Sequence, residues 1–197
     1  MGKSLKSTVR VFVALSSTPE VKRTLTDIQE ELKQEGGEVK WDTPDKFHIT
    51  VKFLGDIDQG RLPALSEALT ALSVLQSSFE LRYESVGAFP DIVHPRVLWA
   101  GARRNDSLAA LHQSIEEACE RLGCAREPRP FHPHITLGRV KGTRNVGRLT
   151  ARLKSLTFEP IEMHCSELLL IRSDLHPTGS IYTTLNSFPF KHNRSFP

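Results

Sequence analysis

The chain has 197 residues, of which 39% are hydrophobic and 25% are charged, and its formal net charge is +3. This composition lies within the range of soluble globular proteins and excludes a disordered or fibrous chain. The longest aliphatic run, residues 168–171, is far shorter than the roughly 20 apolar residues of a membrane helix. The first residues also lack the apolar stretch of a secretory signal, so we expect a cytoplasmic protein without a membrane partner.

The first half of the sequence predicts alternating strands and helices. Residues 9–15 form a short apolar run that is typical of a strand buried on both faces. Thr18 and Pro19 then suit the N-cap and first turn of a helix, and Gly36 ends its apolar periodicity. The same criteria predict three further elements in this half, namely a strand at 47–54, a helix at 62–72 and a strand at 79–84.

The second half of the sequence repeats the opening order. Residues 97–100 form an apolar strand, residues 107–122 a helix that Gly123 ends, and residues 132–140 another strand. The remaining segments predict a helix at 146–153 and two strands, one at 161–171 and one at 180–188. Strands and helices therefore alternate along the chain.

The cysteines do not suggest a disulfide framework or a zinc ribbon. There are three of them, an odd number, and no two are spaced as a CxxC pair. We expect reduced thiols at all three positions, Cys119, Cys124 and Cys165.

An offset of 86 residues relates the two halves. It separates three pairs of matching segments: Arg10-Val11 and Arg96-Val97, Glu30-Glu31 and Glu116-Glu117, and His48-Ile49-Thr50 and His134-Ile135-Thr136. Because the matches share one offset, two strand, helix and strand units are predicted to run in register without a gap. This pattern indicates an internal duplication and a molecule with a pseudo-twofold axis.

The repeated His-x-Thr motif predicts a site between the two halves. Side chains alternate along a strand, so His48 and Thr50 share one face, as do His134 and Thr136. A pseudo-twofold axis would bring two imidazoles and two hydroxyls together across one cleft. Two histidines of opposite protonation state can act as general base and general acid on a phosphorus ester, each contributing about 10²–10⁴-fold in rate.

Two basic residues, Arg139 and Lys52, lie close to these motifs, and the sequence allows more than one position for each side chain relative to the cleft. Arg139 follows His134 by five residues and would face away from it on simple alternation. Either the strand ends or bulges before Arg139, or Arg139 contacts the site from the rim of the cleft. Lys52 continues the face of His48 and Thr50, and either adds positive potential to the cleft or is a solvated lysine at the end of the strand. Trp99 is interpreted as a core aromatic, and Trp41 as the more exposed of the two tryptophans.

A zinc site is the alternative interpretation of the histidines. His132 and His134 are spaced as an HxH pair, and His48 would supply a third imidazole. The threonines are poor zinc ligands and no carboxylate recurs at the offset, so this alternative is disfavoured.

Five segments resemble the two-histidine (2H) phosphoesterase superfamily, and within it the RNA 2′,3′-cyclic phosphodiesterase group, historically named 2′-5′ RNA ligases. They are RVFVALS, FHITVKFLG, PRVLWAG, RPFHPHITLGRV and LLLIRSDLHPTGSIYTTLNSFPF. The resemblance implies one domain at 9–190, with HxTx motifs at 48–51 and 134–137 and tails at 1–8 and 191–197. It implies a bilobal α+β fold, in which two pseudo-twofold-related lobes with antiparallel sheets line a central cleft and the helices lie outside.

The same resemblance implies a reaction and its residues. Water would open a 2′,3′-cyclic phosphate at an RNA end to give a 2′-phosphomonoester, with His134 as proton acceptor and His48 as proton donor. Thr50, Thr136 and Arg139 would bind the phosphate, and no metal or cofactor would be used. Reverse 2′-5′ ligation is a related expectation, as are an RNA or cyclic nucleotide partner and a monomeric state.

Two other functions stay open from the sequence. One is a non-catalytic nucleotide- or RNA-binding module that keeps the cleft without turnover, and the other is the same chemistry on another cyclic phosphate or a 2′-5′ oligonucleotide. Both histidines and both threonines are present, which favours an enzyme, because a binding module needs no pair of opposed proton carriers.

Overall fold

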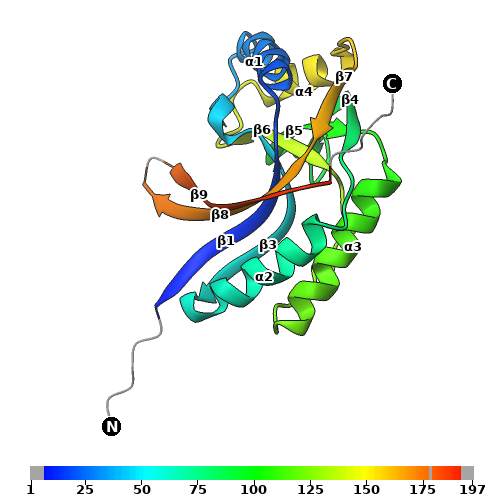
Figure 1. Cartoon of the computed structure of the whole chain (residues 1–197). Helices are drawn as coiled ribbons and strands as arrows, with labels where there is room; N and C mark the ends of the chain where they lie inside the picture. Colours follow the sequence, from blue (N-terminus) through cyan, green and yellow to red (C-terminus); the bar gives the residue numbers. More distant parts are fainter. Residues whose placement is uncertain (1–6, 178, 192–197) are drawn as a thin grey trace, which may run out of the picture.

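In the part of the chain that the structure describes, a curled antiparallel sheet of nine strands has four α-helices packed outside it (Figure 1). The computed structural model describes residues 7–177 and 179–191. The strands are β1 (Thr8–Ser16), β2 (Val39–Trp41), β3 (His48–Asp58), β4 (Phe79–Phe89), β5 (Val97–Ala102), β6 (His134–Val140), β7 (Ile161–Cys165), β8 (Glu167–His176) and β9 (Gly179–Pro189). The helices are α1 (Pro19–Lys33), η1 (Pro44–Lys46), η2 (Gln59–Arg61), α2 (Leu62–Ser73), α3 (Asp106–Arg121) and α4 (Val146–Ser155). The predicted α+β class is confirmed.

Local capping explains where the two long helices begin and end. The Thr18 side chain accepts a hydrogen bond from the amide of Val21, and Asn105 caps α3 in the same way. Gly123 follows α3 with a φ of +77°, a conformation that glycine adopts without steric cost. The predicted helix at 107–122 therefore has the expected ends to within a residue.

The sheet order is β7-β4-β5-β6-β3-β1-β8-β9, with β2 added beside β6. Its two halves meet where Ile49 of β3 pairs with Ile135 of β6. Both isoleucine side chains are fully buried. The lobes that we name after these strands are therefore the β3 lobe (β3, β1, β8, β9) and the β6 lobe (β6, β5, β4, β7), joined into one sheet.

The helices do not stay with the strand that precedes them. Helix α1 follows β1 of the β3 lobe but contacts α4 and β7, whereas α3 follows β5 of the β6 lobe but contacts β3 and α2. Figure 1 shows α1 and α4 at one end of the molecule, and α2 and α3 alongside β1 and β3. Each half of the sequence thus gives a helix to the opposite lobe.

The internal duplication extends further than its sequence matches. With β2, β7 and the short 3₁₀ helices set aside, the order β1-α1-β3-α2-β4 is followed by β5-α3-β6-α4-β8, so α4 and β8 are the counterparts of α2 and β4. The prediction of a gap-free offset was wrong. Leu15 pairs with Ile49 and Ala100 pairs with Ile135, so β1 and β5 are related by 85 residues while the motifs are related by 86. Arg10-Val11 and Arg96-Val97 are consequently not at equivalent positions of the sheet.

Two further sequence predictions are corrected by the structure. The segment 161–171 is two strands instead of one, because β7 pairs with β4 in the β6 lobe and β8 pairs with β1 in the β3 lobe. The short strand β2 was not predicted, since three residues carry too little periodicity. The expected tails fall mostly outside the described residues, which exclude 1–6 and 192–197.

The structure also shows the state of the cysteines and the character of the helices. All three cysteines are free, with Cys119 and Cys165 buried and Cys124 partly buried, as predicted. Among the helices of the described ranges, none has both the length and the apolar character needed to cross a bilayer.

Candidate active site

The two His-x-Thr motifs lie on adjacent strands at the centre of the sheet. Because Ile49 and Ile135 are buried on the helix side, the flanking histidines and threonines turn to the opposite side. His48, Thr50, His134 and Thr136 together line a pocket of about 120 Å³, which Arg139 also lines. The structure therefore brings all five predicted site residues into one place.

Each histidine is oriented by a carbonyl two residues before it. Nδ1 of His134 lies 2.7 Å from the carbonyl oxygen of His132, and the His48 ring is hydrogen-bonded to the backbone of Lys46. A carbonyl can only accept, so Nδ1 of His134 carries the proton, which leaves Nε2 of the neutral ring as an acceptor. The repeated motif thus presents two similarly oriented imidazoles.

Burial lowers the affinity of both imidazoles for protons. Removal from water lowers the pKa of His48 from 6.5 to about 4, with a smaller contribution from His134 in the same direction. Burial is also the main cause that lowers the pKa of His134, and Arg139 adds to it. Both rings are therefore neutral at pH 7 in the unliganded protein.

A β-bulge explains why Arg139 reaches the site. Along β6 the pairing with β5 passes from Thr136 opposite Trp99 to Gly138 opposite Leu98, so β6 contains one extra residue. The bulge reverses the alternation after Thr136, and Arg139 returns to the cleft, where it lines the same pocket as His134. Of the alternatives that the sequence left open for Arg139, the bulge is correct.

The β3 strand carries a bulge at the equivalent place. Its pairing with β1 passes from Thr50 opposite Ala14 to Lys52 opposite Val13, so Val51 is the extra residue. After this bulge Phe53, 86 residues before Arg139, lines the cleft and is 50% exposed. The two lobes therefore share this bulge, but one presents an aromatic ring where the other presents a guanidinium.

Both expectations for Lys52 were wrong, and the bulge is the reason. The side chain of Lys52 is 1% exposed, and its Nζ lies 2.8 Å from each carboxylate oxygen of Glu116 on α3. It also donates to the carbonyl of Ala125 at 2.9 Å. Lys52 is thus neither a free charge in the cleft nor a solvated lysine, but part of a buried ion pair that ties β3 to α3.

A buried glutamine has a comparable role at the bulge of the other lobe. Gln29 of α1 donates through Nε2 to the carbonyls of Asp42 at 2.8 Å and Leu137 at 2.6 Å. Leu137 is at the β6 bulge, so α1 holds this bulge as α3 holds that of β3. Gln29 and Glu116 both interrupt an otherwise apolar helix face, which is the sequence signal that could have identified them.

Aromatic side chains surround each histidine, and sequence reasoning missed them. Phe12 stacks on His48 with ring centroids 4.8 Å apart, and Tyr182 meets the same imidazole edge-on at 5.4 Å. Phe89 meets His134 edge-on at 4.9 Å. Trp99 is partly buried and contacts His132 at 4.8 Å, so it belongs to the cleft side of β5 more than was predicted. These contacts come from strand pairings between distant segments.

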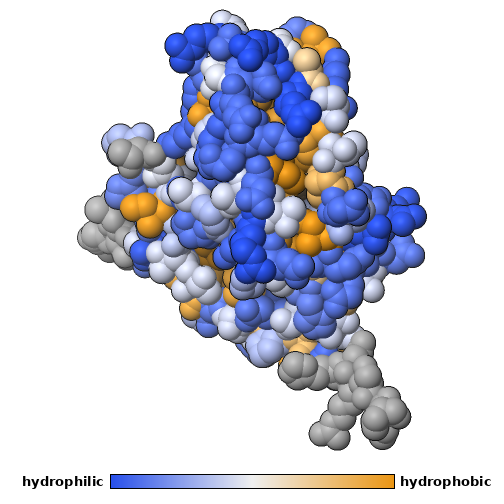
Figure 2. Space-filling view, turned by 90° about the horizontal axis from the view of Figure 1, so that it is seen from above, coloured by the Kyte–Doolittle hydropathy of each residue, from blue (hydrophilic) through white to orange (hydrophobic). Residues whose placement is uncertain are grey.

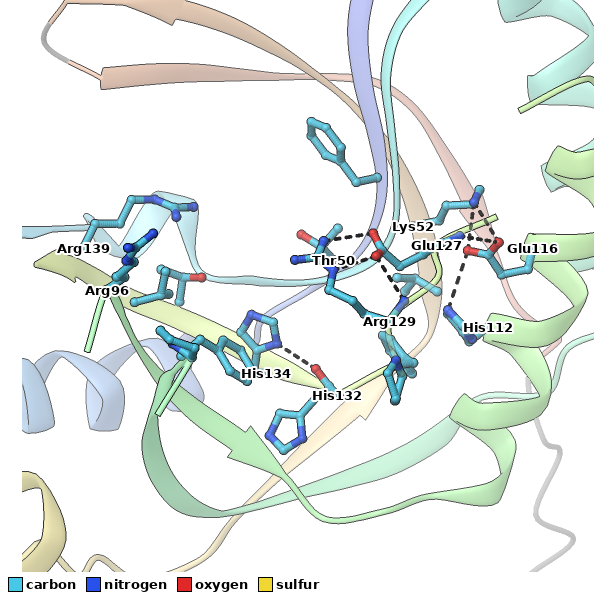
Figure 3. Close-up of a pocket in the computed structure, with 18 residues that line it drawn as sticks. Thr50, Lys52, Arg96, His112, Glu116, Glu127, Arg129, His132, His134 and Arg139 are labelled. Carbon is cyan, nitrogen blue, oxygen red and sulfur yellow. Dashed lines mark hydrogen bonds and ion pairs between the residues drawn. The ribbon is translucent and has the colours of Figure 1, made fainter. Parts of the chain in front are cut away.

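A second, larger pocket adjoins the first. Its volume is about 670 Å³, and it shares Thr50, Phe53, His134, Thr136 and Arg139 with the smaller one. In Figure 3 Arg96 and Arg139 lie at one end of this pocket, Lys52 and Glu116 lie at the other, and His134 is between them. The surface seen from above is mostly hydrophilic, with apolar side chains visible in recesses between polar ones (Figure 2).

The histidines are not arranged as a metal site. Among the residues that the structure describes, no three His, Cys, Asp or Glu side chains are grouped so that they could hold an ion. The hydroxyls, guanidinium and neutral imidazoles instead form a set that can hold an anion and move protons on either side of it.

Comparison with a known protein family agrees with this arrangement. Residues 15–99 and 102–182 match the family described as LigT-like phosphoesterases. The chain is 33% identical over 181 residues to an RNA 2′,3′-cyclic phosphodiesterase of Methanothermobacter thermautotrophicus, with 91% of this chain and 98% of the relative covered. A protein of the same description from Thermotoga maritima is 30% identical over 183 residues, covering 93% of this chain and 96% of the relative.

Solved structures show the same fold. The crystal structure of TT0787 of Thermus thermophilus superposes with a TM-score of 0.79 and 27% identity, covering 93% of this chain and 99% of the other. E. coli LigT complexed with 3′-AMP has a TM-score of 0.75 at 24% identity, with the same coverage. Each similarity spans 93% of this chain and therefore includes both lobes.

Proposed function

The chain belongs to the family of LigT-like phosphoesterases, the two-histidine phosphoesterases, and we propose that it hydrolyses 2′,3′-cyclic phosphates at RNA ends to 2′-phosphomonoesters. Its named relatives are RNA 2′,3′-cyclic phosphodiesterases that align over most of this chain. The catalytic domain in this proposal is residues 9–190, acting as a monomer on RNA in the cytoplasm.

One observation carries the proposal. Two imidazoles, His48 and His134, line one pocket with two threonine hydroxyls and a guanidinium, and both rings are hydrogen-bonded to the backbone two residues earlier. General acid and base catalysis at phosphorus needs proton carriers on opposite sides of the phosphate. The pseudo-twofold relation of the two motifs supports such a placement.

The proposed reaction is a single displacement at phosphorus. His134 accepts a proton from water as the water oxygen bonds to phosphorus, and the bond between phosphorus and O3′ breaks. His48 gives its proton to O3′, so the product keeps its phosphate on O2′. Thr50, Thr136 and Arg139 bind the non-bridging oxygens through hydrogen bonds that are strengthened by charge. The choice of His134 as base and His48 as acid follows the family.

The bound substrate has a second role in this mechanism. A general acid must be charged, yet burial lowers the pKa of His48 to about 4 in the unliganded protein. The negative charge of the cyclic phosphate would favour the protonated ring and raise its pKa in the complex. Substrate binding thereby supplies the protonation state that the reaction needs.

The test is product analysis on an RNA that ends in a 2′,3′-cyclic phosphate. The expected product is the 2′-phosphate, separated from the 3′-phosphate by chromatography against both standards. A 3′-phosphate product would overturn O3′ as leaving group. Tight binding with no product from either the RNA or the cyclic mononucleotide would instead favour the non-catalytic binding module.

Reverse ligation is a second candidate activity of the same residues. In this reaction the 5′-hydroxyl of a second RNA would take the place of water beside His134 in the proposed displacement. The oxygen of that hydroxyl would bond to phosphorus, and O3′ would leave as before, which gives a 2′-5′ linkage. Incubation of the two RNA ends and detection of a joined product with this linkage tests the activity.

A further inference from the structure

Arg96 lies in the larger pocket beside Arg139, and the proposed reaction does not use it. Its amide donates to the carbonyl of Phe89 at 2.7 Å, and its carbonyl accepts from Val140 at 3.0 Å, so the backbone is held between β4 and β6. The side chain is exposed and lines the pocket close to Arg139 (Figure 3). Within residues 7–177 and 179–191, no hydrogen bond or ion pair to the Arg96 guanidinium is found.

This lack of a carboxylate partner distinguishes Arg96 from Arg129, another arginine of the larger pocket. Arg129 also lines the larger pocket, but Glu127 accepts two hydrogen bonds from its guanidinium at 2.7 and 3.0 Å. Its charge is therefore largely neutralised within the protein. Arg96 and Arg139 leave positive potential at their end of the pocket, where a phosphate could accept bidentate hydrogen bonds from a guanidinium fork.

The space around the reacting phosphate indicates where the rest of the RNA lies. Thr50, Thr136 and Arg139 line both pockets, and the smaller one has a volume of about 120 Å³ against about 670 Å³ for the larger. A water molecule takes about 30 Å³, so the smaller pocket is suited to a phosphate and little more. The attached nucleoside must then extend into the larger pocket, where Phe89 and His132 offer rings for stacking with a base.

We propose that Arg96, next to Arg139, binds the phosphodiester on the 5′ side of the terminal nucleotide. The inference rests on the proposed function and adds to it a subsite for a second phosphate of the RNA. A cyclic mononucleotide has no such phosphodiester, so this subsite makes the enzyme select RNA ends over free cyclic nucleotides.

The test compares two substrates with the same terminal base. One is adenosine 2′,3′-cyclic phosphate, and the other is the diadenosine dinucleotide that ends in a 2′,3′-cyclic phosphate. We expect a higher kcat/KM for the dinucleotide in the wild-type protein. Arg96→Ala should lower that value by about tenfold to a hundredfold and leave the mononucleotide value within about twofold. Arg96→Lys, which keeps the charge and loses the fork, should restore part of the loss.

A matched control is Arg104→Ala, because Arg104 is an exposed arginine that lines neither pocket. This variant should leave kcat/KM unchanged for both substrates. Salt gives a second readout, since kcat/KM for the dinucleotide should fall more steeply with ionic strength than for the mononucleotide, and Arg96→Ala should remove this difference.

Several outcomes would overturn the subsite. Equal losses on both substrates in Arg96→Ala would place Arg96 at the cyclic phosphate itself, and equal wild-type kcat/KM values would show that the second phosphate is not bound. Turnover of neither substrate would contradict the proposed function instead. In that case the subsite is tested by the Kd values of adenosine 2′-phosphate and of the dinucleotide with a terminal 2′-phosphate. The subsite requires that the wild-type protein bind the dinucleotide more tightly and that Arg96→Ala abolish this difference.

Discussion

Ile49 of β3 lies directly opposite Ile135 of β6, where the two half-sheets pair. Because both side chains are buried on the helix side, the residues before and after each of them face the cleft. His48 therefore faces the neighbourhood of Thr136, and Thr50 that of His134. The relative placement of the two imidazoles depends on the strand register at this contact, since a slip of one residue would turn each motif to the wrong face.

Substitution of either catalytic histidine should reduce kcat to a similar extent, and the two losses should not be additive. His48→Ala and His134→Ala should each lower kcat by about 10²–10⁴-fold, because each removes one proton transfer from the same step. The double variant should be little slower than the poorer single variant, since groups that act as a unit are not additive. Single-turnover kinetics on a cyclic mononucleotide measures all three rates.

His164→Ala is the control for those variants. His164 is half-exposed and pairs with Glu80 at the far edge of the β6 lobe, outside both pockets. It should leave the rate unchanged. A His48 or His134 variant that retained the wild-type rate would contradict the two-imidazole mechanism.

The pH dependence of kcat/KM should be bell-shaped and acidic. In the free protein His48 must be charged and its pKa is lowered to about 4, while His134 must be neutral and its pKa lies below 6.5. As pH rises, loss of the proton from His134 should raise kcat/KM and loss of the proton from His48 should lower it. Since both pKa values lie below 6.5, both limbs of the bell should lie below pH 6.5. The kcat profile should lie at higher pH, because bound phosphate favours the charged ring. Initial rates across the acidic and neutral range give both profiles, and a kcat/KM optimum above pH 6.5 would contradict the assignment.

The buried pair of Lys52 and Glu116 should respond strongly to loss of one partner. Lys52→Met leaves the buried Glu116 carboxylate without its lysine, with only His112 at 3.8 Å and the amide of Glu127 at 3.4 Å beside it, and it should lower the free energy of unfolding by about 3–5 kcal/mol. The double variant Lys52→Met with Glu116→Leu should regain most of this loss, since apolar groups replace both charges. Urea unfolding of the single and double variants measures the difference.

Arg129→Met provides the matched comparison for that pair. Arg129 and Glu127 also form an ion pair at the larger pocket, but the Arg129 side chain is 83% exposed. Its loss should change the free energy of unfolding by about 0–1 kcal/mol. Similar effects at Lys52 and Arg129 would show that burial is not what makes the Lys52 pair important.

Chelation should leave the reaction unaffected. The proposed mechanism assigns every proton and every phosphate contact to protein side chains, so excess EDTA should not change the rate of cyclic phosphate hydrolysis. Full loss of activity, restored by a divalent cation, would contradict this assignment.

The sequence predicted the centre of the site well for a physical reason. Alternation along a strand is a local rule, and it is enough to place His48 with Thr50 and His134 with Thr136 on common faces. The positions of Arg139 and Lys52 were not predictable in the same way, because a bulge reverses the alternation and depends on pairing with another strand.

The missed residues depend on contacts between distant parts of the chain. Phe12 and Tyr182 reach His48 because β1, β8 and β9 are neighbours in the sheet, which local periodicity cannot specify. The splitting of 161–171 into β7 and β8 has the same origin, since its two parts pair with strands of different lobes. Lys52 within an apolar strand and Glu116 on an apolar helix face were signals of buried charges. That the two charges pair with each other depends on the packing of α3 against β3, which local sequence does not specify.

The exchange of α1 and α3 between the lobes has a consequence for how such a molecule can vary. Two identical chains that traded these helices would form a domain-swapped homodimer, in which any change in one copy appears in the other. Joined in one polypeptide, the copies can diverge separately. One lobe presents Arg139 and Trp99 at positions where the other presents Phe53 and Ala14. Covalent fusion therefore allows a nearly symmetric scaffold to hold two histidines with different partners, and so to support a reaction that has a direction.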